Sequence, residues 1–198
     1  MRLNDIVDEV YFINLDRRPD RLLHVTEQLS SSGIVAQRFP AVDGSTLNSH
    51  PNLSRGAAGC LESQLSIIRM AVESGLNAIA LFEDDVFFVD DFENKFSNFY
   101  QQVPSDWQFV YLANNKYRAT VQRISDNVEK VSEAWSAHAF LIRRAAMEMT
   151  LDIASSGDVP IDVYYGIIQK HLPAYTAVPA LAGQRPDHSA PDPEAGTA

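Results

Sequence analysis

Three consecutive acidic residues, Glu83, Asp84 and Asp85, interrupt an apolar stretch of the chain. The strand-like run 76–82 leads directly into them, and the chain turns apolar again at 86–89. Removing an unpaired carboxylate from water costs several kcal/mol, which is comparable with the net stability of a whole domain. The triplet therefore predicts a cationic partner, either a bound metal ion or arginine side chains.

The spacing of the triplet favours the metal interpretation. In an extended chain Glu83 and Asp85 project to the same side, whereas Asp84 points elsewhere. Two carboxylates on one side can hold a hard divalent ion that also carries the phosphates of a nucleotide. The alternative is a solvated turn after a strand, in which the acids lie close to a helix opened by Asp90 and Asp91.

The charge balance limits the class of partner. The 198 residues include 16 Lys and Arg and 26 Asp and Glu, which gives a formal net charge of −10. This balance argues against nucleic acid as a partner and against docking on anionic lipid. An anionic nucleotide remains compatible where a metal ion and local arginines offset the field, and the cluster of Arg17, Arg18 and Arg21 could contribute.

Cysteine content and hydropathy predict a cytoplasmic protein. Cys60 is the only cysteine, so neither an internal disulfide nor a cysteine-based zinc site can form. The N-terminus lacks a basic start followed by a long apolar core, and no stretch approaches ~20 apolar residues. We therefore expect neither a signal peptide nor a membrane span, which leaves a peripheral contact with a membrane open.

Strand-like and helix-like segments alternate along the chain, which predicts an α/β fold with a mostly parallel sheet. Strands are expected at 9–15, 35–39, 76–82 and 109–112, and a pair of extended segments at 127–135 and 137–142. Helices are expected between 19 and 33, at 57–75, and near 92–101, 144–154 and 163–170.

We expect one domain over residues 1–189, followed by a disordered tail over 190–198. The tail is rich in proline and nearly devoid of large apolar groups, so packing cannot hold it. In a sheet of this kind the ligand crevice lies beyond the carboxyl ends of the strands. Asn14, Asp43 and the acidic triplet all fall there.

Four short motifs follow one another in the first half of the chain. They are Ile13-Asn14-Leu15-Asp16-Arg17-Arg18-Pro19-Asp20-Arg21, Ala41-Val42-Asp43-Gly44, Gly59-Cys60 with Ser63, and Leu81-Phe82-Glu83-Asp84-Asp85-Val86. Looser matches follow at Pro160-Ile161-Asp162 and at Pro179-Ala180-Leu181 with Gln184 and Ser189. In this order the motifs resemble glycosyltransferase family 25, which includes bacterial galactosyltransferases of lipopolysaccharide biosynthesis and the related collagen galactosyltransferases.

The resemblance implies a single nucleotide-sugar-binding domain of the Rossmann-like GT-A type. It further implies a UDP-sugar donor, a divalent ion, usually manganese, held by the acidic motif, and inversion at the anomeric carbon. The transferred group would be a hexose, with galactose as one candidate, and the acceptor a saccharide or glycoconjugate. Two alternatives stay open: a non-catalytic sugar-nucleotide-binding scaffold of the same fold, and another metal-dependent enzyme that processes nucleotides.

The resemblance places the metal ion on the acidic motif, with Asp85 as the first-choice ligand. Glu83 either contacts the ion through water or orients the donor, while Asp84 could bind the ribose or the sugar hydroxyls. His188 is a further candidate ligand from the C-terminal side, the alternative being an exposed histidine in a polar tail.

Inversion by direct displacement needs a base on the face of the sugar opposite UDP. Asp162 is the candidate, although its position fits a helix N-cap equally well. Asp158 is the reserve candidate. Trp135 and Tyr117 could stack on sugars, but aromatic residues beside strands are more often core, so neither is assigned a role.

Polar groups at the first strand ends are candidates for nucleotide binding. Asn14 and Asp43 could hydrogen-bond the uridine, with Arg17 or Arg21 near its phosphates. The alternative is turn chemistry, in which Asn and Asp stabilise loops and Arg21 pairs with a neighbouring acid such as Asp16 or Asp20.

The chain departs from the family pattern at one position. Where the family commonly shows Ser-His after Gly-Cys, this sequence has Ser63-Gln64. Any contact of that histidine is replaced by an uncharged amide, which leaves open whether Gln64 alters or abolishes activity.

Overall fold

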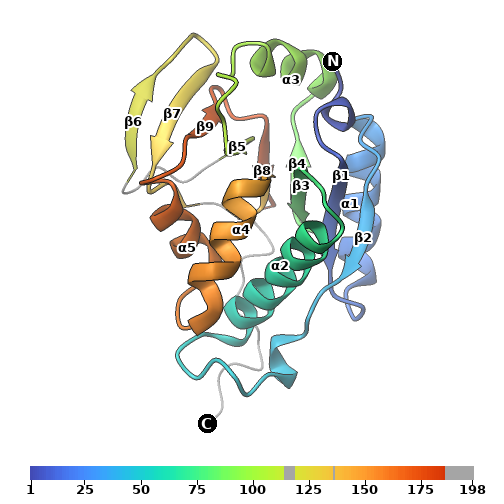
Figure 1. Ribbon diagram of the computed structural model, residues 1–198. Helices are drawn as coiled ribbons and strands as arrows, with labels where there is room; N and C mark the ends of the chain where they lie inside the picture. Colours follow the sequence, from blue (N-terminus) through green and yellow to red (C-terminus); the bar gives the residue numbers. More distant parts are fainter. Residues whose placement is uncertain (114–118, 136, 186–198) are drawn as a thin grey trace.

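The computed structural model describes residues 1–113, 119–135 and 137–185 (Figure 1). Its strands are β1 (Glu9–Asn14), β2 (Gln37–Pro40), β3 (Ala78–Glu83), β4 (Val86–Phe88), β5 (Phe109–Tyr111), β6 (Thr120–Arg123), β7 (Val128–Ser132), β8 (Ala139–Arg143), β9 (Ala174–Ala177) and β10 (Ala182–Gln184). Its α-helices are α1 (Pro19–Ser31), α2 (Arg55–Glu73), α3 (Phe92–Tyr100), α4 (Arg144–Ile153) and α5 (Ile161–Ile168). Short 3₁₀ turns form at Leu3–Asp5, Gly44–Thr46 and Ala154–Ser156.

The predicted α/β architecture is confirmed. Eight strands form one sheet in the order β2-β1-β3-β8-β5-β9-β7-β6, in which β7 and β8 run opposite to the other six. Parallel pairing of β1 with both β2 and β3 aligns the carboxyl ends of these strands. Asn14 and Glu83, the last residues of β1 and β3, are thereby brought to the same edge of the sheet.

Alternation along the strands divides the core into two layers. On β1, Val10 and Phe12 face a cluster that includes α1 and α3, whereas Tyr11 and Ile13 face a cluster built with α2, α4 and α5. Figure 1 shows α2, α4 and α5 together in front of the sheet. The sheet is therefore covered on both faces, as its almost continuously apolar strands require.

Two helix starts follow directly from the sequence. Pro19 occupies the first turn of α1, where its missing N–H and fixed φ are favourable. Ser54 caps α2, because its hydroxyl accepts from the backbone N–H of Ala57 across 3.2 Å. The predicted helix at 57–75 is thereby confirmed as α2.

The extended segments expected at 127–135 and 137–142 both contain strands, but the two strands are not neighbours. β7 pairs with β6 and β9, whereas β8 lies between β3 and β5. Residues Ala139 to Ile142 are fully buried. A strand without a polar face is stable only where both faces are covered, so β8 takes a central position in the sheet.

A two-stranded sheet returns the C-terminal part of the chain to the acidic triplet. β10 pairs antiparallel with β4, which places Gln184 opposite Val86. The backbone N–H of Arg185 also donates to the carbonyl of Asp85 across 3.0 Å. No strand was predicted for residues 182–184.

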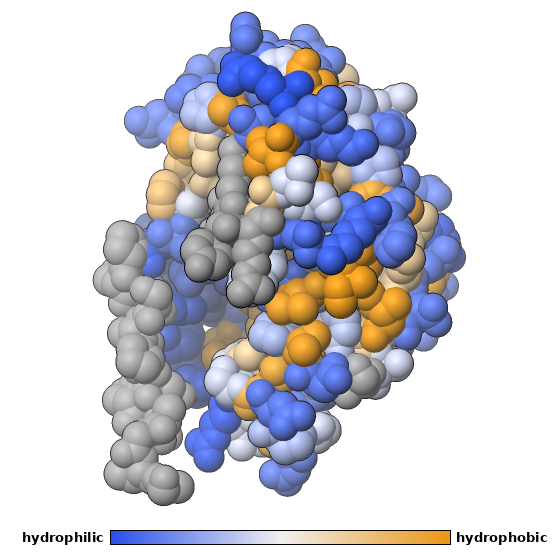
Figure 2. Space-filling model, turned by 90° about the vertical axis from the view of Figure 1, so that its left-hand side faces the viewer, coloured by the Kyte–Doolittle hydropathy of each residue, from blue (hydrophilic) through white to orange (hydrophobic). Residues whose placement is uncertain are grey.

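Helix α5 is held in place by the side chains that it buries against the core. Tyr165 and Ile168 are fully buried, whereas Ile167 is 43% exposed. Figure 2 shows apolar side chains gathered on the face of the molecule that carries β6, β7 and α5. Apolar atoms make up much of the surface of any folded protein. The buried contacts of Tyr165 and Ile168 hold α5 and its first turn in place.

Within the described residues, no helix is both long enough and apolar enough to cross a membrane. The cytoplasmic localisation stays a prediction. The proposed tail at 190–198, the candidate ligand His188 and the aromatic residue Tyr117 lie outside the described residues.

Candidate functional site

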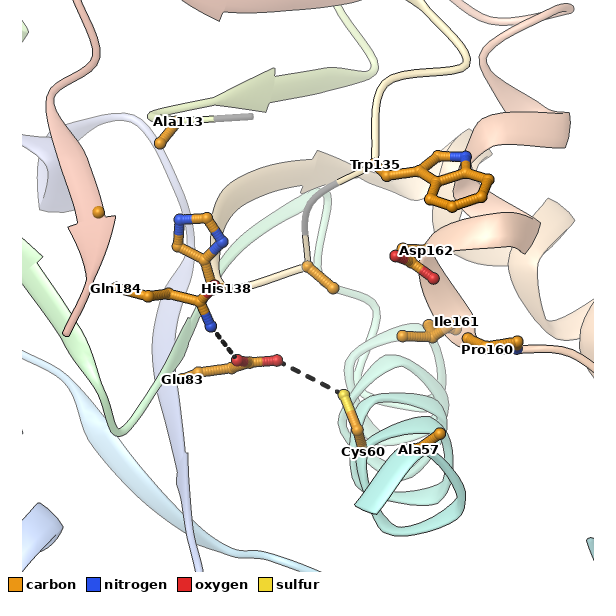
Figure 3. Close-up of a pocket in the computed structure, with 12 residues that line it drawn as sticks. Ala57, Cys60, Glu83, Ala113, Trp135, His138, Pro160, Ile161, Asp162 and Gln184 are labelled. Carbon is orange, nitrogen blue, oxygen red and sulfur yellow. Dashed lines mark hydrogen bonds between the residues drawn. The ribbon is translucent and has the colours of Figure 1, made fainter. Parts of the chain in front are cut away.

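A pocket of about 470 Å³ lies beside the carboxyl end of β3. Its walls come from α2 (Ala57, Cys60), the end of β3 (Glu83), Ala113 after β5, the segment before β8 (Trp135, Ala137, His138), the start of α5 (Pro160, Ile161, Asp162) and β10 (Gly183, Gln184). Two of the candidate residues, Glu83 and Asp162, lie on opposite walls of this pocket (Figure 3).

The acidic triplet divides into two sides as expected, although Asp84 and Asp85 form a turn between β3 and β4 and not an extended strand. The side-chain amide of Gln184 donates to Oε2 of Glu83 across 3.0 Å and to Oδ1 of Asp85 across 3.3 Å. Glu83 and Asp85 therefore present oxygens on the same side of the chain. Asp84 turns the other way, where its carboxylate accepts from Asn14 across 2.8 Å and from Arg21 across 2.9 Å.

Arg21 supplies the cationic partner of Asp84. Its guanidinium lies 2.9 Å from Asp84 and 3.7 Å from Asp85, and all three side chains are largely buried. Asp20, which precedes Arg21 in the sequence, pairs instead with Arg18 across 2.7 Å. Of the two predicted kinds of partner, the arginine is present on the Asp84 side of the triplet, whereas Glu83 and Asp85 face the uncharged amide of Gln184 and the metal ion stays a prediction.

Asn14 and Asp43 make the contacts expected of turn chemistry. Asn14 is 1% exposed, and besides Asp84 it contacts the carbonyl of Arg18 and the guanidinium of Arg38. Asp43 accepts from the backbone N–H of Ser45 at the start of the turn Gly44–Thr46. A hydrogen bond from Arg17 holds the pKa of Asp43 well below its usual range. Contacts of these side chains with a nucleotide stay a prediction.

The electrostatic environment of Glu83 favours binding a proton or a cation. Burial, followed by repulsion from Asp85, raises the pKa of Glu83 to about 7. Cys60 donates to Oε1 of Glu83 across 3.5 Å, and burial raises the pKa of the Cys60 thiol, so the thiol keeps its proton. A positive charge between Glu83 and Asp85 would relieve their repulsion.

The donor set fits a divalent ion that has further ligands outside the protein. In the part of the chain that the structure describes, no cluster of three or more His, Cys, Asp or Glu side chains could hold a metal ion. Glu83 and Asp85 nevertheless direct oxygens at one amide of Gln184. Two carboxylates are a sufficient protein contribution where phosphate oxygens and water complete the coordination.

Asp162 lies in the first turn of α5, one residue beyond its start. Pro160 occupies the N-cap position, so the N-cap alternative for Asp162 is wrong. Asp162 is only partly exposed, and burial raises the pKa of its carboxyl. The reserve candidate Asp158 accepts from the hydroxyl of Tyr164 across 2.7 Å and is not part of the pocket wall described above.

Three residues without an assigned role also line the pocket: Gln184, His138 and Trp135. In the sequence Gln184 stands only within a loose motif match, and the pairing of β10 with β4 brings it to Glu83 and Asp85. Burial lowers the pKa of His138, so its imidazole is neutral at pH 7. Trp135 and His138 come from the segment before β8, and no spacing rule joins them to Gln184, which lies on β10.

Gln64 does not reach the pocket wall. It is 0% exposed, accepts from the hydroxyl of Tyr165 across 2.7 Å and donates to the carbonyl of Ala137 across 3.1 Å. The departure from the family pattern therefore changes a buried connection between α2, α5 and the segment before β8.

Comparison with known proteins gives consistent matches. A family model described as glycosyltransferase family 25 (LPS biosynthesis protein) matches residues 7–165. The probable inactive glycosyltransferase 25 family member 3 of Rattus norvegicus is 27% identical over 227 residues, covering 94% of this chain and 39% of its own length. Procollagen galactosyltransferase 1 of Danio rerio is 26% identical over 215 residues, covering 88% of this chain and 36% of its own length.

Among solved structures, a mutant of Drosophila β-1,4-galactosyltransferase 7 in complex with manganese, UDP-Gal and xylobiose is 11% identical, with a TM-score of 0.47 over 89% of this chain and 69% of the other. The chain spans about two fifths of the length of the two relatives named above. The family model matches well over half of the chain. The chain belongs to glycosyltransferase family 25.

Proposed function

We propose that this protein transfers a hexose from a UDP-sugar to a hydroxyl of a saccharide acceptor, with inversion at the anomeric carbon and with a divalent ion bound at the acidic motif. The observation that carries this proposal is the joint contact of Glu83 and Asp85 with Gln184, at one end of a pocket whose other wall holds Asp162.

On the donor side, Glu83 and Asp85 would hold the ion, whose chemistry is to offset the negative charge that develops on UDP as the glycosidic bond breaks. Arg21 supports this arrangement because it neutralises Asp84 and keeps the third carboxylate turned away. A galactosyl donor agrees with the relatives, since procollagen galactosyltransferases are among them. Manganese is the ion that the family resemblance implies.

On the acceptor side, Asp162 would take the proton of the attacking hydroxyl. The oxygen then forms its bond to the anomeric carbon while the bond from that carbon to the diphosphate oxygen breaks. A partly buried carboxylate with a raised pKa is a better proton acceptor than an exposed one. The family description, which names lipopolysaccharide biosynthesis, favours an oligosaccharide as the acceptor class.

A sugar-nucleotide-binding scaffold without turnover is the second candidate. It is favoured by the relatives named as inactive members of the family and by Gln64, which replaces the usual histidine. Such a scaffold binds UDP but transfers no sugar.

Calorimetric titration of UDP tests the donor site. We expect binding in the presence of manganese, loss of binding with a chelator, and loss in Asp85→Asn. Asp90→Asn is the matched control, because Asp90 is an exposed acid close by in the chain. Absence of UDP binding under both conditions would remove the proposal.

Product release separates the two candidates. With UDP-galactose or UDP-glucose and manganese, a transferase releases UDP slowly to water and faster when a suitable saccharide is added. A protein that binds UDP and releases none from either donor, with a panel of oligosaccharide acceptors present, is the scaffold.

A further inference from the structure

Trp135 borders the pocket on the same side as Asp162. In Figure 3 its indole and the Asp162 carboxylate lie on one side of the pocket, across from Glu83, His138 and Gln184. Trp135 is only partly buried, unlike Trp107, which is 2% exposed in the core. The ring therefore belongs to the wall of the pocket and is not simply a core residue.

Ala134, the residue before Trp135, is held by hydrogen bonds to both its backbone N–H and its backbone carbonyl. The N–H of Ala134 donates to Oε1 of Gln169 across 2.9 Å, and its carbonyl accepts from Nε2 of Gln169 across 3.0 Å. Nε2 of Gln169 also donates to the hydroxyl of Tyr111 across 2.8 Å. Gln169 is 5% exposed and Ala134 0%, so these bonds form away from water, where leaving them unmade is costly.

The hydrogen bonds between Ala134 and Gln169 form a clamp, and the residue before Ala134 has an unfavourable backbone conformation. Glu133 has a φ of 59°, in the left-handed region that residues with a Cβ rarely adopt. Its carboxylate pairs with Lys170 across 2.7 Å, just beyond α5. Such conformations persist where the surrounding structure determines them, and they concentrate at binding and catalytic sites.

Helix α5 sets the position of the indole edge. A Cβ added to Gly166 would lie 3.7 Å from Nε1 and 3.8 Å from Cδ1 of Trp135, so this edge of the ring lies close to the helix. Asp162 lies one helical turn earlier on α5. One helix thereby positions both the carboxylate and the aromatic ring.

We propose that Trp135 is the surface on which the acceptor sugar stacks, so that a pyranose hydroxyl is directed at Asp162. A pyranose ring has an apolar face of C–H groups that suits a flat aromatic surface, while its hydroxyls need polar partners. The opposite wall carries Glu83 and Gln184, and the UDP-sugar donor would bind there. This assignment rests on the proposed function, in which Asp162 is the base.

Saturation-transfer NMR tests the assignment with the methyl pyranosides of galactose, glucose, mannose and N-acetylglucosamine, each measured with and without UDP and manganese. We expect transfer to the C–H protons of at least one pyranoside. In Trp135→Ala the signal should fall about fivefold or more, as loss of an aromatic contact implies. Trp135→Phe should keep most of it.

Two controls separate a binding role from a structural one. Leu23→Ala truncates a large apolar side chain that is 62% exposed on α1, and it should leave the saccharide signal unchanged. Gln169→Leu removes the clamp without touching the pocket wall, and it should weaken the saccharide signal in a protein that still unfolds cooperatively. Manganese-dependent UDP binding should be the same in Trp135→Ala as in the wild type.

The assignment is overturned if no pyranoside receives saturation from the wild type, or if Trp135→Ala and the wild type give equal signals. Failure of the proposed function has a different signature, namely absence of UDP binding in the wild type. A saccharide signal that depends on Trp135 in a protein without UDP binding would retain the stacking surface and remove only the donor assignment.

Discussion

Arg21 and Asp84 form an ion pair in which the guanidinium Nη1 lies 2.9 Å from the carboxylate Oδ1, joining the first turn of α1 to the end of β3. The two side chains are 18% and 9% exposed. This pair neutralises one acid of the triplet inside the protein. Glu83 and Asp85 are left with an amide contact in common, and their repulsion is what an added cation would relieve.

Breaking this pair should destabilise the fold. In Asp84→Ala the buried guanidinium of Arg21 loses its nearest carboxylate, and we expect the free energy of unfolding to fall by about 3 kcal/mol. Urea denaturation followed by circular dichroism measures the change. Asp20→Ala, which breaks an exposed pair with Arg18, should have a much smaller effect. Equal losses in both variants would contradict the structural role given to Asp84.

Glu83 should make stability depend on pH in the absence of a metal ion. The pKa of Glu83 is raised from 4.5 to about 7, so between these values the folded protein holds a proton that the unfolded chain has released. The free energy of unfolding contributed by this group is therefore full below about pH 4.5 and is lost as pH rises to about 7.

The measurement is urea denaturation at pH 5 and pH 7.5 with chelator present. The wild type should lose stability between these values relative to Glu83→Gln, which carries no charge at either pH. The exposed Glu73→Gln serves as the matched control and should follow the wild type. Manganese added at pH 7.5 should stabilise the wild type more than Glu83→Gln, because binding to the folded state alone raises its stability.

Asp162 should determine the acidic limb of the pH–rate profile for transfer. Burial raises the pKa of this carboxyl above the ordinary value of 3.8, so kcat/KM should rise with pH through that shifted value. Asp162→Asn should lower transfer by about 10² to 10⁴-fold and leave UDP binding intact. Asp158→Asn is the discriminating variant, since its contact with Tyr164 predicts a loss of stability with the acidic limb retained.

The local parts of this structure could be predicted from the sequence because short-range rules govern them. Apolar runs and helix starts indicated β1, α2 and β3, and an alternation rule placed Glu83 and Asp85 on one side. The strand ends that carry Asn14 and Glu83 meet because parallel neighbours align. These inferences need only the order of residues along one or two elements.

The remaining features depend on long-range pairing. The extended segments expected at 127–135 and 137–142 follow each other in the chain, but β8 enters the sheet between β3 and β5, away from β7. Gln184 reaches Glu83 only because β10 returns to β4, and periodicity within a three-residue strand gives little signal. The sequence assigns no role to Trp135, because the contact between Ala134 and Gln169 that positions it joins segments 35 positions apart.

Gln64 tests whether the departure from the family pattern acts on the fold or on the donor site. Gln64→Leu leaves the Tyr165 hydroxyl and the Ala137 carbonyl without their partner, so we expect the free energy of unfolding to fall by about 2 kcal/mol. Gln64→His should lose less, because an imidazole nitrogen can still accept from Tyr165. The exposed Gln122→Leu is the matched control and should leave stability nearly unchanged.

Calorimetry measures whether Gln64 also affects UDP binding. Gln64 lies behind the pocket and not in its wall, so manganese-dependent UDP binding should be the same in the wild type and in Gln64→His. A change in UDP affinity without a change in the free energy of unfolding would show that Gln64 affects the donor site although it does not line the pocket. Unchanged affinity together with faster UDP release in Gln64→His would show that the family's histidine serves the transfer step, since this substitution alters the support of α5 and of the segment that carries Ala137.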